Sequence, residues 1–133
     1  MGAPIVGTGA GVGTGAGVGT GVAIGTGVDR EVALSRVGGD TELLAEIAGL
    51  FLDDYPKLLD ELKTGAAQGD AKTIERAAHG LKGSVSNFGA RAAVEAAFAL
   101  EKMGRQQELS GVTAGILALE QALATLRPEL EAL

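Results

Sequence analysis

The sequence contains no cysteine and no tryptophan, and its only aromatic residues are three phenylalanines and one tyrosine. Without cysteine the chain can form neither disulfide bonds nor thiolate metal sites, which fits a reducing compartment such as the cytoplasm. With so few aromatic rings, a hydrophobic core has to be built from Leu, Ala, Val and Ile, which suits packed helices. The composition is 46% hydrophobic and 21% charged, as in ordinary soluble globular proteins.

Basic residues are outnumbered by acidic ones, 11 to 17, which gives a net charge of −6. Binding of nucleic acids usually requires a strongly basic face, and an anionic membrane surface also attracts basic segments. We therefore expect neither nucleic acid nor a membrane surface to be a partner of this chain.

The N-terminal segment differs from the rest of the chain in composition. It has no charged residue before Asp29, and residues 1–27 hold 11 of the 22 glycines. Alternating glycine maximises backbone entropy and leaves little side chain to bury. We interpret residues 1–28 as a flexible Gly-rich linker or tail and residues 29–133 as one folded domain. Stacked Gly-rich strands are the alternative for this segment.

Three functional interpretations of the same segment fit less well. A phosphate-binding loop needs a lysine after the glycines or a Gly-x-Gly-x-x-Gly spacing, and the strict alternation provides neither. The abundance of Gly and Thr makes insertion into a membrane weak. A secretory signal would need a charged start and a solid apolar run.

Beyond the tail, apolar residues recur at spacings of three and four, which predicts helices. We expect a short helix over residues 29–37 and a long helix over 41–63, with Asp40 as its N-cap. Asp70 should cap a third helix that ends at Gly89. Further helices are expected over residues 90–103 and from 112 to the end, with breaks at 65–69 and 104–110. This pattern predicts an all-α, antiparallel four-helix bundle with a short extra N-terminal helix.

The expected core follows from the apolar stripe of each helix. Two prolines fall inside helices, where Pro56 should bend the long helix and Pro128 should kink or loosen the last turns. The final stripe has a coiled-coil-like spacing, but a bundle needs that same face, so we expect a monomer. The stripes comprise Leu44, Ile47, Phe51, Tyr55, Leu58 and Leu62 in the long helix, Val94, Ala97, Phe98 and Met103 in the fourth, and Ile116, Leu119, Leu123, Leu126, Leu130 and Leu133 in the last.

His79 is the single histidine of the chain. On a helix with about 100° per residue, it lies within roughly 60° of a set of mainly polar residues. The apolar residues of the same helix, among them Leu81 and Phe88, point the other way, so the imidazole should face solvent. The polar set consists of Lys72, Glu75, Arg76, Lys82, Gly83 and Ser86.

Four roles are open for such a histidine. It can be a surface residue without a function, which is the commonest case. A metal site is poorly supported, because no second His or Cys exists. A general acid or base in an enzyme such as a hydrolase is also poorly supported, because the helix face offers no carboxylate besides Glu75 and no nucleophile turn. The remaining role is a nucleophile that carries a phosphoryl group.

The neighbours of His79 suit this last role. Free imidazole has a pKa of about 6.5 and is therefore mostly neutral and nucleophilic near pH 7. Lys82 lies one turn on and can meet phosphoryl oxygens. Gly83 and Gly80 leave room for another protein to approach. Because the chain has no ATP-binding loop, the phosphoryl group has to come from a partner that brings its own metal ion.

At this point the sequence resembles a known family. Residues 78–90 read Ala-His-Gly-Leu-Lys-Gly-Ser-Val-Ser-Asn-Phe-Gly-Ala. They are similar to the signature of histidine-containing phosphotransfer (HPt) domains, approximately Ala-His-x-Leu-Lys-Gly-Ser-Ser-x-Asn-(Leu/Phe)-Gly-Ala. Residues 29–133 resemble that family more loosely. Two positions depart from it: Gly80 stands where Thr is common, and Val85 replaces a small residue.

The resemblance implies a four-helix bundle and a carrier role without independent turnover. By position, His79 would accept a phosphoryl group from an aspartyl phosphate of a receiver domain and pass it to a second receiver. Lys82 would assist electrostatically, and Ser84 and Asn87 would support the helix environment. We also expect Gly83, Gly80, Arg76, Ser86 and Lys72 to contact the partner.

The resemblance further implies that no cofactor is bound by this chain and that Mg²⁺ belongs to the partner receiver. The domain would be cytoplasmic, either free-standing or the C-terminal part of a hybrid sensor histidine kinase joined by the Gly-rich linker. The alternative is a helical docking module that binds a receiver or a kinase without being phosphorylated.

Overall fold

The computed structural model describes residues 27–133 of the chain. This part consists of five helices and contains no strand, which confirms the predicted all-α bundle with a short N-terminal helix. The expectations for residues 1–26 lie outside the described residues. The helices are α1 (Arg30–Arg36), α2 (Thr41–Gln68), α3 (Ala71–Ser86), α4 (Arg91–Gln106) and α5 (Val112–Glu131).

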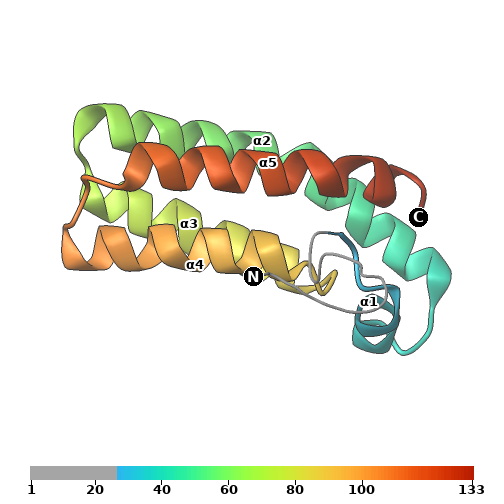
Figure 1. Cartoon of the computed structure of the whole chain (residues 1–133). Helices are drawn as coiled ribbons and strands as arrows, with labels where there is room; N and C mark the ends of the chain where they lie inside the picture. The colour runs from blue at the N-terminus through green and yellow to red at the C-terminus, as the bar shows by residue number, and fades with distance from the viewer. Residues whose placement is uncertain (1–26) are drawn as a thin grey trace.

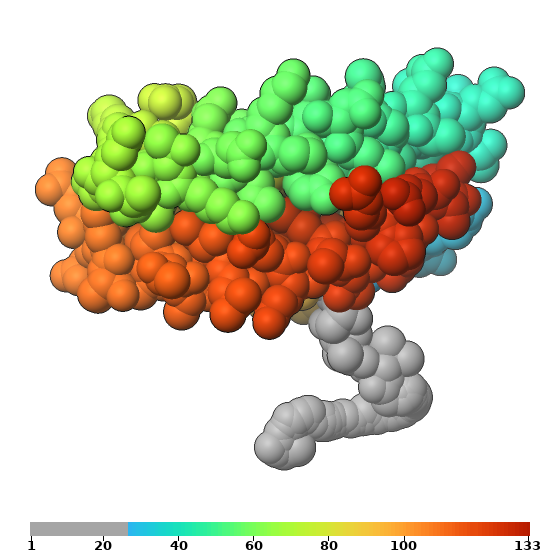
Figure 2. Space-filling model, turned by 90° about the horizontal axis from the view of Figure 1, so that it is seen from above, coloured from blue at the N-terminus to red at the C-terminus, as the bar shows by residue number. Residues whose placement is uncertain are grey.

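The four long helices form a bundle in two layers (Figure 1). One layer contains α3 and α4, and the other contains α2 and α5, which lie side by side in both Figure 1 and Figure 2. Each of the four long helices runs antiparallel to the next one in the chain (Figure 1). Short α1 packs against α2 at one end of the bundle. Helix α3 therefore packs against α4 in one layer, and α2 packs against α5 in the other.

Aspartates cap the first three helices. The side chains of Asp29, Asp40 and Asp70 accept hydrogen bonds from the backbone N–H groups of Val32, Leu43 and Thr73 respectively. Such caps each contribute about 1 kcal/mol. The predicted N-caps Asp40 and Asp70 are thereby confirmed.

Two predicted breaks were placed too early. The long helix does not end near residue 63 but continues to Gln68, and Gly65 lies buried inside it. A Cβ atom at Gly65 would come within 3.0 Å of Thr73 Cγ2, so this glycine serves a close approach between helices rather than a break. The chain turns at Gly69, whose φ of 65° is left-handed.

The loop predicted from residue 104 also starts later, because α4 extends to Gln106 with Gly104 buried in it. In contrast, the third helix ends at Ser86, three residues before Gly89. Gly89 has a φ of 62°, and a Cβ atom there would lie 2.6 Å from Asp29 Cβ. Both prolines lie within continuous helices, Pro56 in α2 and Pro128 in α5.

The core contains most of the expected apolar stripes. The prediction that Phe98 is available for burial in the core is wrong, because its side chain is exposed on α4. None of the helices in residues 27–133 is long and apolar enough to span a bilayer. Fully buried side chains include Leu62 from α2, Ile74, Leu81 and Val85 from α3, Phe88, Leu100 from α4, and Leu119 and Leu126 from α5.

Candidate functional site

His79 lies in the middle of α3, where the helix packs between α2 and α4. The inward positions of α3, among them Ala77, Leu81 and Val85, are buried, as the helical periodicity predicts. The imidazole is 68% exposed. The helix therefore anchors its apolar stripe in the core and presents the ring to solvent.

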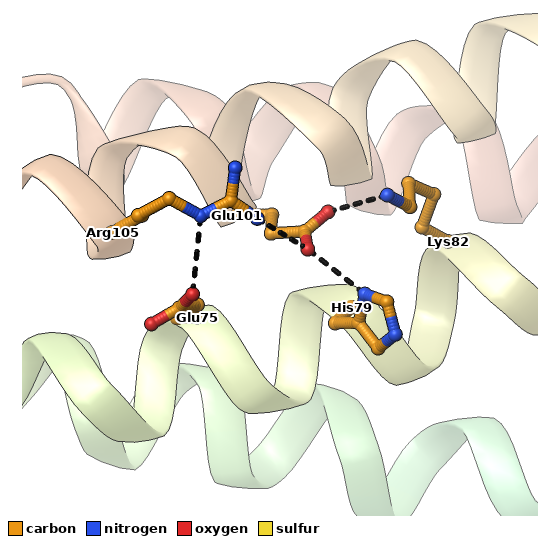
Figure 3. A network of polar contacts seen from close by, with 5 residues as sticks. All are labelled: Glu75, His79, Lys82, Glu101 and Arg105. Atoms are coloured by element: carbon orange, nitrogen blue, oxygen red, sulfur yellow. Dashed lines mark hydrogen bonds and ion pairs between the residues drawn. The ribbon is translucent and has the colours of Figure 1, made fainter.

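Glu101 of α4 is the main functional side chain that the sequence analysis missed. Its Oε2 lies 2.8 Å from Nδ1 of His79, and only 3% of the residue is exposed (Figure 3). A signal was present in the sequence. Glu101 follows Ala97 by four residues and precedes Gly104 by three, so it lies on the buried stripe of α4. A carboxylate on such a stripe needs partners.

Two cations share this carboxylate with the imidazole. Lys82 Nζ forms an ion pair with Oε1 of Glu101 at 2.7 Å. Arg105 donates from Nη2 to Oε2 at 2.9 Å and from Nε to Glu75 at 3.2 Å. Figure 3 shows how these groups converge on Glu101 from both α3 and α4. Glu101 is thus the centre of the polar network that holds the histidine.

The ionisation of Glu101 follows from this environment. Burial by itself raises the pKa of the carboxyl group, but the contacts with Lys82 and His79 lower it by more, so the net pKa is below that of an ordinary glutamate. Glu101 is therefore a carboxylate at neutral pH. A carboxylate can only accept hydrogen bonds.

This fact determines which ring nitrogen is free. A neutral imidazole carries one N–H group, and the bond made by one nitrogen sets the state of the other. Since Glu101 accepts at Nδ1, that nitrogen holds the proton and Nε2 keeps its lone pair. In Figure 3 the second ring nitrogen points away from Glu101. In the neutral ring, this geometry places the lone pair of Nε2 on an exposed helix face.

An open pocket of about 400 Å³ lies beside the imidazole. It brings the predicted contact residues Lys72 and Arg76 together with the histidine, and it adds Arg105 from α4. A pocket with three basic residues suits an anionic ligand group. The lining residues are Lys72, Glu75, Arg76, His79, Glu101 and Arg105.

The two glycines near His79 have different surroundings. A Cβ atom at Gly83 would have no neighbour within 4 Å, so this position is open on the exposed face. A Cβ atom at Gly80 would lie 3.6 Å from both Cδ atoms of Leu58 in α2. The small size of Gly80 therefore serves helix packing, and its contact with a partner stays a prediction.

The remaining motif residues lie at the end of α3. Ser86 donates from Oγ to the carbonyl oxygen of Gly83 at 2.7 Å. Ser84 is half-buried, and Asn87 is the exposed C-cap of the helix. The described residues contain no group of three His, Cys, Asp or Glu side chains that could hold a metal ion.

Comparisons with known proteins show the family and the fold of this chain. A family model described as the Hpt domain matches residues 46–129, which include His79, Lys82 and Glu101. Among solved structures, the chain is similar to histidine-containing phosphotransfer protein B (HptB) from Pseudomonas aeruginosa. The two chains are 27% identical, with a TM-score of 0.73 over 79% of this chain and 91% of that one.

A second solved structure, the HPT domain of an Hpt sensor hybrid histidine kinase from Shewanella, shares the fold. Here the identity is 19% and the TM-score 0.71, over 83% of this chain and 94% of that one. The search of curated proteins found no match. The family match begins within α2 and ends within α5, so it includes residues of all four long helices.

Proposed function

This chain belongs to the Hpt domain family, and from that premise we propose that His79 is the residue on which it carries a phosphoryl group. The chain is a phosphoryl carrier of two-component phosphorelays, and not an enzyme with its own turnover. The observation that carries the proposal for His79 is the bond between its Nδ1 and the buried Glu101. This bond leaves Nε2 as the exposed nucleophile.

The chemical step is an in-line displacement at phosphorus. The lone pair of Nε2 attacks the phosphorus atom of an aspartyl phosphate on a receiver domain. A bond forms between nitrogen and phosphorus, and the bond from phosphorus to the aspartate oxygen breaks, which releases a carboxylate. The proton stays on Nδ1 throughout. The positive charge that the ring gains is stabilised by the carboxylate of Glu101, 2.8 Å away. Transfer to a second receiver reverses these bond changes.

Basic side chains of this chain would assist the negatively charged phosphoryl group. Lys82 is 28% exposed and pairs with Glu101, so its ammonium group lies at the edge of the site. Lys72, Arg76 and Arg105 line the pocket beside the imidazole. The Mg²⁺ ion and the carboxylates that bind it would be supplied by the receiver. This chain would thus supply the nucleophile and the cations, and the receiver would supply the metal ion and the leaving carboxylate.

The proposal also covers the oligomeric state of the chain, its location and its contacts with receivers. The chain acts as a monomer in the cytoplasm, either alone or as the C-terminal part of a hybrid sensor kinase. The docking of receivers involves Gly83, Ser86 and the cations around His79. The alternative function is a docking module that binds receivers without being phosphorylated, but the ordered, buried partner of the imidazole favours chemistry at Nε2.

Transfer of labelled phosphate tests the proposal. The purified chain is mixed with a panel of receiver domains that carry radiolabelled aspartyl phosphate, and label on the chain is followed on gels. We expect label that is lost in acid and kept in base, as for a phosphorylated histidine, and none in His79→Gln. Binding of a receiver without any transfer of label would instead support the docking module. Hydrolysis of a phosphorylated small molecule without a receiver would support a hydrolase.

A further inference from the structure

Phe98 is the exception among the four aromatic residues of the chain. The other three, Phe51, Tyr55 and Phe88, are buried. Phe51 stacks on Tyr55 with 5.2 Å between ring centroids and packs at 5.7 Å against Phe88. In contrast, Phe98 is 42% exposed on the outer face of α4. Aromatic residues are enriched in protein–protein interfaces, which makes this exposed ring a candidate contact.

The position of Phe98 links it to the reactive histidine. Lys82 Nζ and Lys102 Nζ each lie 5.0 Å from the centroid of its ring, in cation–π geometry. Lys82 also contacts Glu101, which holds His79. A chain of direct contacts thus leads from the exposed ring to the imidazole. Phe98 and His79 are thus joined through Lys82 and Glu101.

The distribution of charge indicates what kind of surface this is. Helices α3 and α4 together carry six basic and three acidic residues, whereas α2 and α5 carry three basic and nine acidic residues. The two pairs form opposite layers of the bundle (Figure 1). The layer with His79 and Phe98 is therefore basic on a chain whose net charge is −6. Such a layer fits an acidic partner and repels a basic one.

We propose that Phe98, held between the ammonium groups of Lys82 and Lys102, is the apolar anchor by which an acidic receiver domain docks over His79. The proposal rests on the phosphotransfer function of the same site and adds the residue that sets affinity for the partner. An aromatic side chain has few rotamers, so ordering it at an interface costs little entropy. Covering the ring excludes water from both cation–π contacts and strengthens them. Truncation of such an anchor weakens binding more than truncation of its neighbours.

The test compares Phe98→Ala with Leu117→Ala. Leu117 is also an exposed apolar residue, 55% accessible, but it lines a groove between α2 and α5 in the other layer. Binding of each unphosphorylated receiver of the panel is measured by titration calorimetry. We expect Phe98→Ala to raise Kd about tenfold and Leu117→Ala to leave it within twofold. Because both residues are exposed, circular dichroism should show the wild-type helix content in each variant.

A second pair tests the charge. Lys102→Ala should weaken binding by about three- to tenfold at low salt and less at high salt. Lys57 is an exposed residue of α2, and Lys57→Ala removes the same charge there. This variant should leave Kd within twofold. If both lysine variants weaken binding equally, net charge alone acts and the proposal of a local anchor is wrong.

Transfer kinetics separate docking from chemistry. In Phe98→Ala, KM for the phosphorylated receiver should rise about tenfold while kcat stays within twofold. Labelling of His79 by phosphoramidate, a small donor that needs no docking, should be unchanged. A Kd equal to that of the wild type, or a loss of phosphoramidate labelling, would overturn the anchor. Absence of transfer from every receiver to the wild-type chain would instead refute the proposed function, and the two failures are distinct.

Discussion

Replacing Glu101 by glutamine tests the role of the buried carboxylate most directly. The glutamine has nearly the same shape, and its amide oxygen can still accept a hydrogen bond from Nδ1 of His79. The substitution removes the negative charge and replaces one acceptor oxygen by an NH2 donor. The tautomer with a free Nε2 should therefore persist, while the stabilisation of a positively charged phosphorylated ring is lost.

The magnitude follows from the contacts of Glu101. A hydrogen bond to a charged group contributes about 1.5–3 kcal/mol, against about 0.5–1.5 kcal/mol for a neutral one. Loss of the charge at the 2.8 Å contact with His79 should thus cost about 1–2 kcal/mol in the transition state. This corresponds to a rate of transfer that is about 5- to 30-fold lower. Stability should fall by about 1–3 kcal/mol, less than for a fully buried pair, because Lys82 and Arg105 can return to water.

Rapid-quench measurement of label transfer and urea denaturation give these two quantities. Glu75→Gln is the matched control, since Glu75 also pairs with Arg105 but makes no hydrogen bond or ion pair with His79. Nitrogen NMR of the imidazole should show the proton on Nδ1 in the wild type and in Glu101→Gln. A folded Glu101→Gln protein that transfers at the wild-type rate, or a wild-type ring with its proton on Nε2, would refute the reasoning.

Three other changes have defined outcomes. Glu101→Gln should also change the stability of the fold in acid. The lowered pKa of Glu101 stabilises the folded state above the ordinary carboxyl range, and this stabilisation is lost as pH falls through the lowered value. In an acid titration followed by circular dichroism, Glu101→Gln should therefore lose less stability than the wild type. Gly83→Leu should keep or raise thermal stability, since nothing lies within 4 Å of the added Cβ, while transfer from a receiver drops; unchanged transfer would count against close approach there. Gly104→Ala should destabilise the chain by about 1–3 kcal/mol in urea, because its Cβ would lie 2.7 Å from the backbone oxygen of Ala71; wild-type stability would show that α3 and α4 can move apart at no cost.

Local interactions made much of the fold predictable. The caps at Asp40 and Asp70 involve residues only three positions away, and helical spacing sorts neighbouring residues into inner and outer faces. The outward orientation of His79 followed from the apolar residues of its own helix. The same reasoning misplaced the helix end near Gly65, because a glycine that breaks an isolated helix is tolerated where a neighbouring helix needs the space.

The contacts between helices depend on register and rotation, which single-helix periodicity does not contain. Gly104 lets α4 approach the backbone of α3, and this register brings Glu101 to Nδ1 of a histidine 22 residues earlier. The rotation of α4 places Ala97 and Leu100 in the core and leaves Phe98 outside. The residue types and helical spacing of the chain thus predicted a bundle with an outward-facing nucleophile. Packing of α4 on α3 decided that Glu101 lies at Nδ1 of the ring and that Phe98 is exposed beside Lys82.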